Sequence, residues 1–572
     1  MNKSMILSVF ATLSLAGQSA VLEVGAARQY KTIQAAADVA VAGDTVLIDA
    51  GVYREWVKPA NAGTSDRPIT YRARERGTVV ISGADVIVGW RKRTDGLWEV
   101  KLPYDRFGGL NPFTDFIHGN WFEARNKETY PRAFLFRGRG KMRYRAKIED
   151  FKLPYYNSSK MKYADGMIPA AEKRPYVGSF ALKPGMAAGT VIADFKEDPN
   201  DGGTELVVRP CCFYPVVEFR DYQRLEGLVF CDAGPNWAGP HSEQLGVVGV
   251  NWSRGWVIED CEIRGSTCAG LTLGKHGDEF DNYVQKSQRY TEAIDRAIKF
   301  GFDRVGHHTV RRCRIRDCGQ AGICGSLGAV FSTIADCDIG YCHWLENFDG
   351  CEMACIKLHG AVDVEIVGNE LHHAGDFGGI WLDWMSQGTF VSRNRIHDLV
   401  LSRGDAGGVY IEVGHGPSIL ENNVIDARQA IHICGTHDVA IVGNELYGSV
   451  SWWDDPFKRS TPFWKPHSPV LDQMLVRCTT GGCRLYNNVM KLPVSCPLDA
   501  RSVSVGNLVV SNRAAFAAAK RSAAFVPVDT ATLGTNTLGQ AFERRDGSPY
   551  VWRQAAEKTA AVSVTHNERN LQ

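Results

Sequence analysis

A short alternation of apolar and polar positions recurs along much of the chain. Each copy has an apolar residue, two or so polar residues, a Cys or Asn, one more residue and a second apolar residue, as in residues 258–263 and 366–371. Successive Cys or Asn positions are separated by 52, 24, 32, 25, 29, 21, 44 and 19 residues. Several of these intervals lie in the range of solenoid repeats, and the two long ones require insertions. The positions are Cys261, Cys313, Cys337, Asn369, Asn394, Asn423, Asn444, Asn488 and Asn507.

These repeats predict an all-β fold, a parallel β-helix. Each copy is short, rich in β-branched residues and bounded by Gly or Asn, which excludes a helical repeat. One coil cannot bury its own apolar face, whereas stacked coils share a continuous core. In such a stack the Asn side chains can hydrogen-bond from coil to coil, and Cys can fill the same place as a small buried group.

The repeats also divide the chain. We expect an N-terminal cap and the first coils over residues 21–88, with a short helix and a strand within residues 30–53. No coil repeat is present from about residue 89 to 222, where short β-like runs predict an inserted β-sandwich domain. The main β-helix spans residues 223–512, and an Ala-rich C-terminal segment follows over residues 513–572. The two long intervals hold a predicted helix at residues 290–299 and an aromatic-rich segment at residues 452–467.

Charge and targeting signals limit the partners and the compartment. The chain has 65 basic and 64 acidic residues without a basic run, which argues against nucleic acid or a membrane as a partner. Residues 1–20 have one Lys, an apolar stretch and small residues near the end, which is typical of a signal peptide. We therefore expect a periplasmic or secreted protein. The 16 Cys residues could form disulfides in that setting, but buried free thiols are the preferred interpretation for most of them.

Two acidic residues occupy the same position in successive repeats. Asp383 ends the run Gly-Gly-Ile-Trp-Leu-Asp, and Glu412 ends the run Gly-Gly-Val-Tyr-Ile-Glu. On neighbouring strands of one stack the two carboxylates would be about 4.8 Å apart. Such a pair is costly because the charges repel, and it matches the separation of roughly 5–5.5 Å that retaining glycosidases use. We therefore predict Asp383 as nucleophile and Glu412 as acid/base, with a raised pKa for Glu412.

The two-residue period of a strand places both acids on the outer face of the helix. Because the apolar residues of these runs point inward, Trp381, Asp383, Tyr410 and Glu412 are expected to point outward, toward water. The same face should also carry Lys357, His359 and His432.

Residues around the pair are candidates for binding a sugar. Trp381, Trp384 and Tyr410 offer aromatic faces for stacking, although they could simply cover the sheet. Glu352 and His359 are candidates for sugar hydroxyls, with a turn carboxylate and a surface histidine as the alternative. A cluster of His372, His373 and Asp376 could hold a metal, but a structural role is preferred, and we predict no metal ligand and no cofactor.

The same residues resemble a known family. The segments 379–384, 411–417, 422–423 and 461–468 are similar to those of glycoside hydrolase family 120, the β-xylosidases. The resemblance extends from the N-terminal cap to about residue 510. It implies a right-handed parallel β-helix interrupted by a β-sandwich, and a retaining exo-hydrolase that releases xylose from β-linked xylo-oligosaccharides. It also supports Asp383 and Glu412 in their predicted roles, and His415 and His467 lie in its segments as further candidates for substrate binding.

Two other functions stay open on the sequence alone. A polysaccharide lyase acting on an acidic glycan also suits a β-helix, and Lys357 could serve as its base. A non-catalytic glycan-binding solenoid would need neither acid. In each case the expected partner is an oligosaccharide, and a homo-oligomer is possible.

Overall fold

The computed structural model describes residues 19–123, 129–152, 176–240, 242–275, 277, 281, 304–343, 348–401, 404–463, 472–494, 499–512, 515, 516, 519, 526–528 and 550. The predicted helix at 290–299, nearly all of the predicted signal peptide and most of the C-terminal segment lie outside these residues. So does His467.

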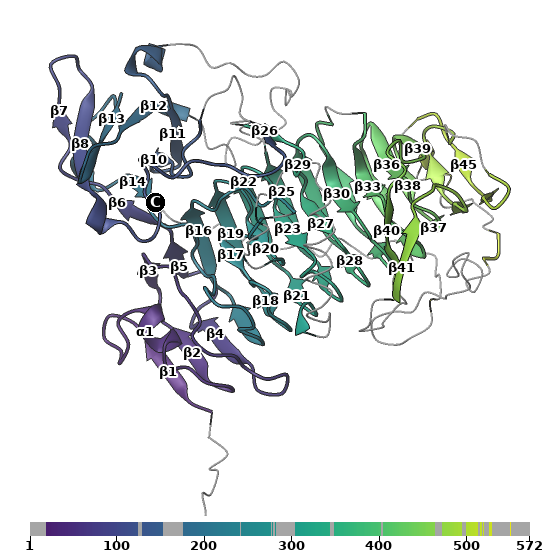
Figure 1. Cartoon of the computed structure of the whole chain (residues 1–572), viewed down its shortest axis with the longest axis horizontal. Coiled ribbons are helices and arrows are strands. Elements are labelled where there is room, and N and C mark those ends of the chain that lie inside the picture. Colours follow the sequence, from purple (N-terminus) through teal and green to yellow (C-terminus); the bar gives the residue numbers. More distant parts are fainter. Residues whose placement is uncertain are drawn as a thin grey trace, which may run out of the picture.

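Three long parallel sheets form the walls of a β-helix, and Figure 1 shows the coils stacked along the long axis of the molecule. The first sheet has 13 strands, in the order β1 (Val21–Val24), β2 (Thr45–Ile48), β4 (Ile69–Ala73), β15 (Gln223–Glu226), β18 (Val257–Glu259), β21 (Thr309–Arg311), β24 (Thr333–Ala335), β28 (Glu365–Val367), β31 (Phe390–Ser392), β34 (Ser418–Glu421), β37 (Val439–Val442), β42 (Arg484–Tyr486) and β44 (Val503–Val505).

The second sheet has 12 strands, in the order β3 (Gly51–Tyr53), β5 (Val79–Ser82), β16 (Val229–Ala233), β19 (Glu262–Ser266), β22 (Arg314–Cys318), β25 (Asp338–Cys342), β29 (Glu370–Ala374), β32 (Arg395–His397), β35 (Val424–Ile425), β38 (Glu445–Leu446), β43 (Val489–Met490) and β45 (Leu508–Val509). The third has eight, in the order β17 (Val248–Gly249), β20 (Leu271–Thr272), β23 (Ile323–Ser326), β27 (Ile356–His359), β30 (Gly378–Asp383), β33 (Gly407–Glu412), β36 (Gln429–Cys434) and β39 (Ser449–Trp453). The predicted all-β parallel β-helix is confirmed.

Alternate residues of the strands fill the interior. Ile258, Val310, Ile334 and Ile366 occupy matching places in successive strands of the first sheet, and all are fully buried in one continuous apolar core. Because a single coil exposes its inner face, this shared core is what makes the stack stable.

The predicted Asn column forms a hydrogen-bonded ladder. The Oδ1 of Asn394 accepts from both the backbone N and the Nδ2 of Asn369, at 2.9 Å each. The same two bonds recur from Asn394 to Asn423 and onward to Asn507. At the N-terminal end of the ladder, Asn369 Oδ1 accepts from the backbone N of Cys337, and in the earlier coils buried cysteines occupy the equivalent position.

The interruption between the early and later coils carries a separate sheet. Its eight strands run in the order β6 (Ala84–Val86), β14 (Thr204–Val207), β10 (Leu135–Arg137), β11 (Gly140–Tyr144), β12 (Tyr176–Lys183), β13 (Ala188–Ala193), β8 (Trp98–Pro103) and β7 (Arg91–Lys92). They enclose their own apolar core, which includes Trp90, Phe113, Leu135 and Phe180. Figure 1 shows this sheet standing off one end of the stack. The arrangement of this region as a two-layered sandwich stays a prediction.

Short elements complete the described chain. The helix α1 (Ile33–Ala37), capped by Thr32, packs Ile33 and Ala36 against the first coils. Single turns of 3₁₀ helix lie at Tyr104–Arg106, Ile148–Lys152 and Pro199–Asp201. Two small antiparallel pairs join β9 (Phe122–Glu123) to β26 (Asp349–Gly350), and β40 (Ser460–Phe463) to β41 (Asp472–Arg477).

The cysteines of the described residues form no disulfide. All 15 of them are free thiols, and all but Cys351 are buried, which confirms the preferred interpretation of the Cys pattern. Among the helices of the described residues, none has the length and apolar character that crossing a membrane requires.

Candidate active site

The two predicted carboxylates lie side by side on the third sheet. Strands β27, β30 and β33 pair in parallel, and their register puts His359 beside Asp383 and Asp383 beside Glu412. Adjacent strands are about 4.8 Å apart, so the two acids occupy neighbouring coils at the same height of the wall.

The predicted alternation of side chains is confirmed. Ile380, Leu382, Val409 and Ile411 belong to the interior core. Trp381 and Tyr410 belong to a different apolar cluster on the outer side of the sheet.

The prediction that this outer face meets water is wrong. Asp383 is 7% exposed, Trp381 4%, Tyr410 1% and His432 0%. Phe377 stacks on Trp381, and Arg459 reaches Glu412 from the insertion that follows β39. The alternation of a strand determines the direction of a side chain, but the segments that cover it come from elsewhere in the chain.

Basic side chains surround the carboxylate of Asp383. The Lys357 Nζ lies 2.8 Å from its Oδ2, and the His359 Nε2 lies 3.2 Å from the same oxygen. Glu352 completes the group, because its Oε2 lies 3.4 Å from Lys357 Nζ and 3.2 Å from His359 Nε2. His359 and Glu352 are therefore in the site, where they contact the predicted nucleophile and its cations.

The carboxylate of Glu412 has a different neighbour. The guanidinium of Arg459 donates from Nη2 to Glu412 Oε1 at 2.8 Å. Arg459 is in turn held by Asp455, whose Oδ1 accepts at 3.0 Å and whose Oδ2 accepts from the Arg459 backbone N at 2.6 Å.

These surroundings shift the two acids in opposite directions. For Asp383, burial favours the neutral form, but the charges of Lys357, His359 and Arg459 prevail and lower its pKa to about 2. For Glu412, burial and the charge of Asp383 prevail over Arg459 and raise its pKa to about 7. The predicted rise for Glu412 is thus present. Near neutral pH the pair consists of a carboxylate and a carboxyl group close to its midpoint, which is the combination of nucleophile and general acid.

Stacked, buried rings lie beside the acids on the outer side of the sheet. The ring centroids of Phe377 and Trp381 are 4.1 Å apart, and those of Trp381 and Tyr410 are 5.4 Å apart. The Lys357 Nζ lies 3.2 Å from the centroid of Trp381. This cation–π contact fixes the ammonium between the ring and the Asp383 carboxylate.

Trp384 and His415 lie differently. Trp384 is half-buried and packs on a separate apolar cluster with Leu327, Phe331 and Met385. His415 is fully buried, with Nε2 2.7 Å from Thr461 Oγ1 and Nδ1 3.2 Å from His437 Nε2. The predicted role of His415 in substrate binding is therefore not supported, because its ring nitrogens already bind a strand of the covering insertion and a neighbouring coil.

Sequence reasoning did not single out Arg459 and Asp455. Both lie in the 44-residue interval between Asn444 and Asn488, whose aromatic residues drew attention. A signal was available in the spacing of Asp455 and Arg459, a pair four residues apart inside a predicted binding loop. It did not say which coil the loop would cover.

Metal binding can be tested against the donor sets. The oxygens and nitrogen of Glu352, His359 and Asp383 lie within 4.8 Å of one another, but the ammonium of Lys357 already binds both carboxylates. His372 does not join Asp376: it binds Asp338 through Nε2 at 2.8 Å, and its Nδ1 lies 2.6 Å from that of His373.

Comparison with known proteins agrees with this geometry. Residues 246–446 match the family described as "Right handed beta helix region". A solved structure titled "The complex structure of XylC with xylose" has a TM-score of 0.73 and 31% identity, covering 83% of this chain and 76% of that chain. A second, titled "Glycoside hydrolase", is 16% identical, with a TM-score of 0.48, and covers 76% of this chain and 95% of its own.

Among curated proteins, "Uncharacterized protein YwoF" of Bacillus subtilis (strain 168) is 41% identical over 59 residues. That match covers 10% of this chain and 13% of YwoF, far less than two thirds of its length. The likeness to XylC extends over most of both chains, and the match to the right-handed β-helix family over residues 246–446 includes the paired strands that carry Asp383 and Glu412. The protein is therefore a glycoside hydrolase, and the chain belongs to glycoside hydrolase family 120.

Proposed function

We propose that the protein is a retaining exo-glycosidase that releases xylose from β-linked xylo-oligosaccharides. The observation that carries the mechanism is the pairing of Asp383 with Glu412 on adjacent strands, with the pKa lowered on one and raised on the other. The sugar is inferred from the relative of 31% identity that was solved with xylose.

In the first step Asp383 attacks the anomeric carbon. Lys357 and His359 hold its Oδ2, so we assign the attack to Oδ1. As the new carbon–oxygen bond forms, the glycosidic bond breaks and Glu412 gives its proton to the leaving oxygen. The product is a glycosyl ester on Asp383 and an ionised Glu412.

The second step reverses the roles. Esterification removes the negative charge of Asp383, which is one of the causes of the raised pKa of Glu412. The Glu412 carboxylate then takes a proton from water, the water oxygen bonds to the anomeric carbon, and the ester bond breaks. Two inversions at one carbon leave the configuration of the sugar unchanged.

Burial favours exo action. The Asp383 side chain is 10% exposed and that of Glu412 is 16% exposed, while Arg459 and Phe377 cover the outer face. A covered site of this kind suits the end of a chain better than the middle of a polymer that must pass through.

The lyase alternative is less consistent with the contacts. Lys357, the candidate base, binds the carboxylates of Asp383 and Glu352 at 2.8 and 3.4 Å. These two ion pairs and the contact of Nζ with the ring of Trp381 hold the Lys357 side chain among the acids, away from a proton of the substrate. A non-catalytic solenoid would have no use for the opposed pKa shifts of the pair.

The decisive experiment follows hydrolysis of an aryl β-xyloside by ¹H NMR. We expect β-xylose as the first product and its later mutarotation to the α anomer. Asp383→Asn should lower kcat by about a thousandfold or more, because the nucleophile is lost while the shape is kept. The matched control is Asp363→Asn, a buried aspartate outside the site. First-formed α-xylose, or full turnover by Asp383→Asn, would contradict the proposal, as would unsaturated products.

A further inference from the structure

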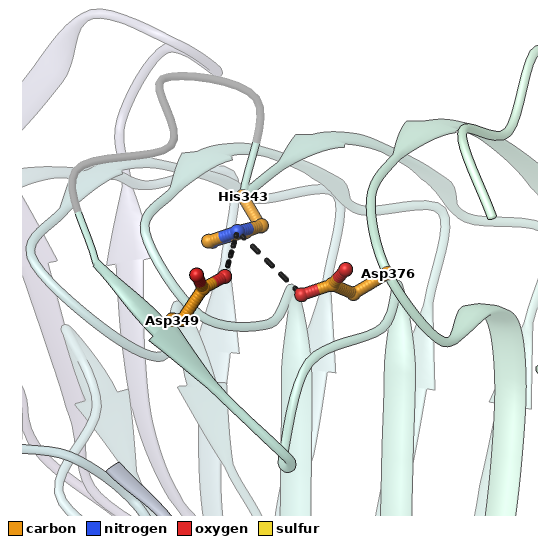
Figure 2. A group of neighbouring side chains, drawn as sticks. All are labelled: His343, Asp349 and Asp376. Carbon is orange, nitrogen blue, oxygen red and sulfur yellow. Dashed lines mark ion pairs between the residues drawn. The ribbon is translucent and has the colours of Figure 1, made fainter. Parts of the chain in front are cut away.

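A second cluster of side chains lies in the segments that lead into the strands of the active site. His343 follows β25, Asp349 begins β26, and Asp376 follows β29. Figure 2 shows the carboxylates of Asp349 and Asp376 both turned toward the same nitrogen of the His343 ring. The His343 Nε2 lies 3.9 Å from Asp349 Oδ1 and 3.9 Å from Asp376 Oδ2, and the three donor atoms all lie within 4.8 Å of one another.

The tautomer of His343 is set from outside the cluster. Its Nδ1 lies 3.1 Å from the backbone oxygen of Gly319. A carbonyl oxygen only accepts, so Nδ1 carries a proton, and in the neutral ring Nε2 then has a lone pair. A histidine that donates its other N–H to a backbone carbonyl is the arrangement in which imidazoles bind metals.

The distances fit an ion better than a hydrogen bond. A protonated Nε2 would approach a carboxylate oxygen to roughly 2.7–3.2 Å, and both separations here are too long. Ligand bonds of about 2.0–2.2 Å at a tetrahedral angle place two ligands of one ion about 3.3–3.6 Å apart, so each separation would have to shorten by only roughly half an ångström. His343 is 1% exposed and Asp376 3% exposed, whereas the Asp349 side chain is 31% exposed. The cluster therefore lies in the interior with one carboxylate that water, and an ion from water, can reach.

We propose that His343, Asp349 and Asp376 bind a divalent transition-metal ion of the zinc type. An imidazole ligand with two carboxylates suits zinc, whereas calcium and magnesium prefer sites built wholly from oxygen. The neighbouring group of Glu352, His359 and Asp383 has the same residue types, but there the ammonium of Lys357 contacts both carboxylates, where a metal ion would have to bind.

The ion would join two parts of the molecule. Asp349 lies on β26, which pairs with β9 from the interrupting region and leads to Glu352 three residues later. Asp376 directly precedes Phe377, which stacks on Trp381. The metal is thus a structural link that holds the strand before Glu352 against the coil that carries Asp383.

The test uses the full chain and zinc as the probe. After exposure to Zn²⁺ and dialysis, elemental analysis of the wild type should give about one zinc per chain. Asp376→Asn keeps a residue type that tolerates the left-handed backbone at this position (φ 59°), and Asp349→Asn is the second variant. Each should lose the zinc or bind it at least roughly tenfold more weakly.

The matched control is Asp338→Asn, which alters the hydrogen-bonded pair of Asp338 and His372 and should keep the wild-type zinc content. Chelation should lower the Tm of the wild type and of this control but not of Asp376→Asn. Wild-type protein that binds no zinc, that retains calcium in preference to zinc, or that loses no zinc on Asp376→Asn overturns the proposal. Because the wild type is decisive by itself, a variant that fails to fold leaves the test intact, and no readout depends on glycosidase activity.

Discussion

At the scale of single residues, the two acids differ through their neighbours. Asp383 and Glu412 end equivalent strand patterns in adjacent coils, but Lys357 and His359 stand beside the first, whereas Arg459 donates a hydrogen bond to the second. The ionised Asp383 then raises the pKa of Glu412, since a second negative charge nearby is unfavourable. The division of labour is therefore electrostatic.

The pH profile should report this division. The first step needs protonated Glu412 and ionised Asp383, so kcat/KM should fall as pH rises through about 7 and should fall on the acid side only as pH approaches about 2. Glu412→Gln should remove the basic limb and should slow substrates with poor leaving groups far more than aryl substrates with good ones. Rates measured from pH 4 to 9 check this. A basic limb that survives in Glu412→Gln would assign it to another group.

The pH at which kcat/KM falls on the basic side should depend on Arg459. Its charge and hydrogen bond lower the pKa of Glu412, so Arg459→Ala should move the basic limb upward by roughly one pH unit. Arg459→Lys keeps the charge and should restore most of the original position. The same pH series checks both variants. A loss of rate with an unmoved limb would show that Arg459 only supports the fold of its loop.

At the scale of elements, the Asn ladder links the coils independently of the apolar core. Each ladder amide donates to a backbone carbonyl of an earlier coil, as Asn394 Nδ2 does to Ile366 O at 2.9 Å, and each Oδ1 from Asn394 to Asn507 accepts two bonds. These groups are buried, so every missing bond leaves a donor or acceptor without water to replace it.

Asn394→Ala should therefore be costly. It leaves the backbone N of Asn369 and the carbonyl of Ile366 without their bonds in the interior, for a loss of about 2–4 kcal/mol in the free energy of unfolding. Asn507→Ala at the end of the ladder should cost clearly less, because Asn507 is half-buried and water can reach its partners. Equilibrium unfolding of both variants measures the difference. Equal losses would mean that burial does not set the strength of the ladder.

At the scale of the whole molecule, stability comes from stacking without covalent links among the described residues. The core runs from Val24 to Met490 as one apolar cluster that includes eight cysteines, and all 15 described cysteines are free thiols. A solenoid held in this way needs no disulfide, because each coil covers the next.

Redox conditions should accordingly leave the fold unchanged. Adding a thiol reductant should not alter the Tm, and a thiol reagent should detect at least 15 thiols per chain after denaturation and far fewer in the native protein. Thermal melts with and without reductant, together with thiol titration, check this. A large drop in Tm on reduction would contradict this, because it would mean that some of the 15 described cysteines form disulfides.

The sequence alone determined the repeat, the fold and the partnership of the acids. Periodicity is local information: Cys261 to Asn507 mark the coils, and equal positions in successive coils must become neighbours once the coils stack. Asp383, Glu412, His359 and Trp381 could be aligned on one face for that reason.

Only the tertiary structure decided what surrounds that face. Arg459 reaches Glu412 from an insertion of irregular length, His415 is enclosed by the strand around Thr461, and Asp376 faces His343 and Asp349 instead of the adjacent His372 and His373. These contacts depend on how loops fold back across several coils. No period in the sequence records that path, because loop conformation is set by packing against distant parts of the chain.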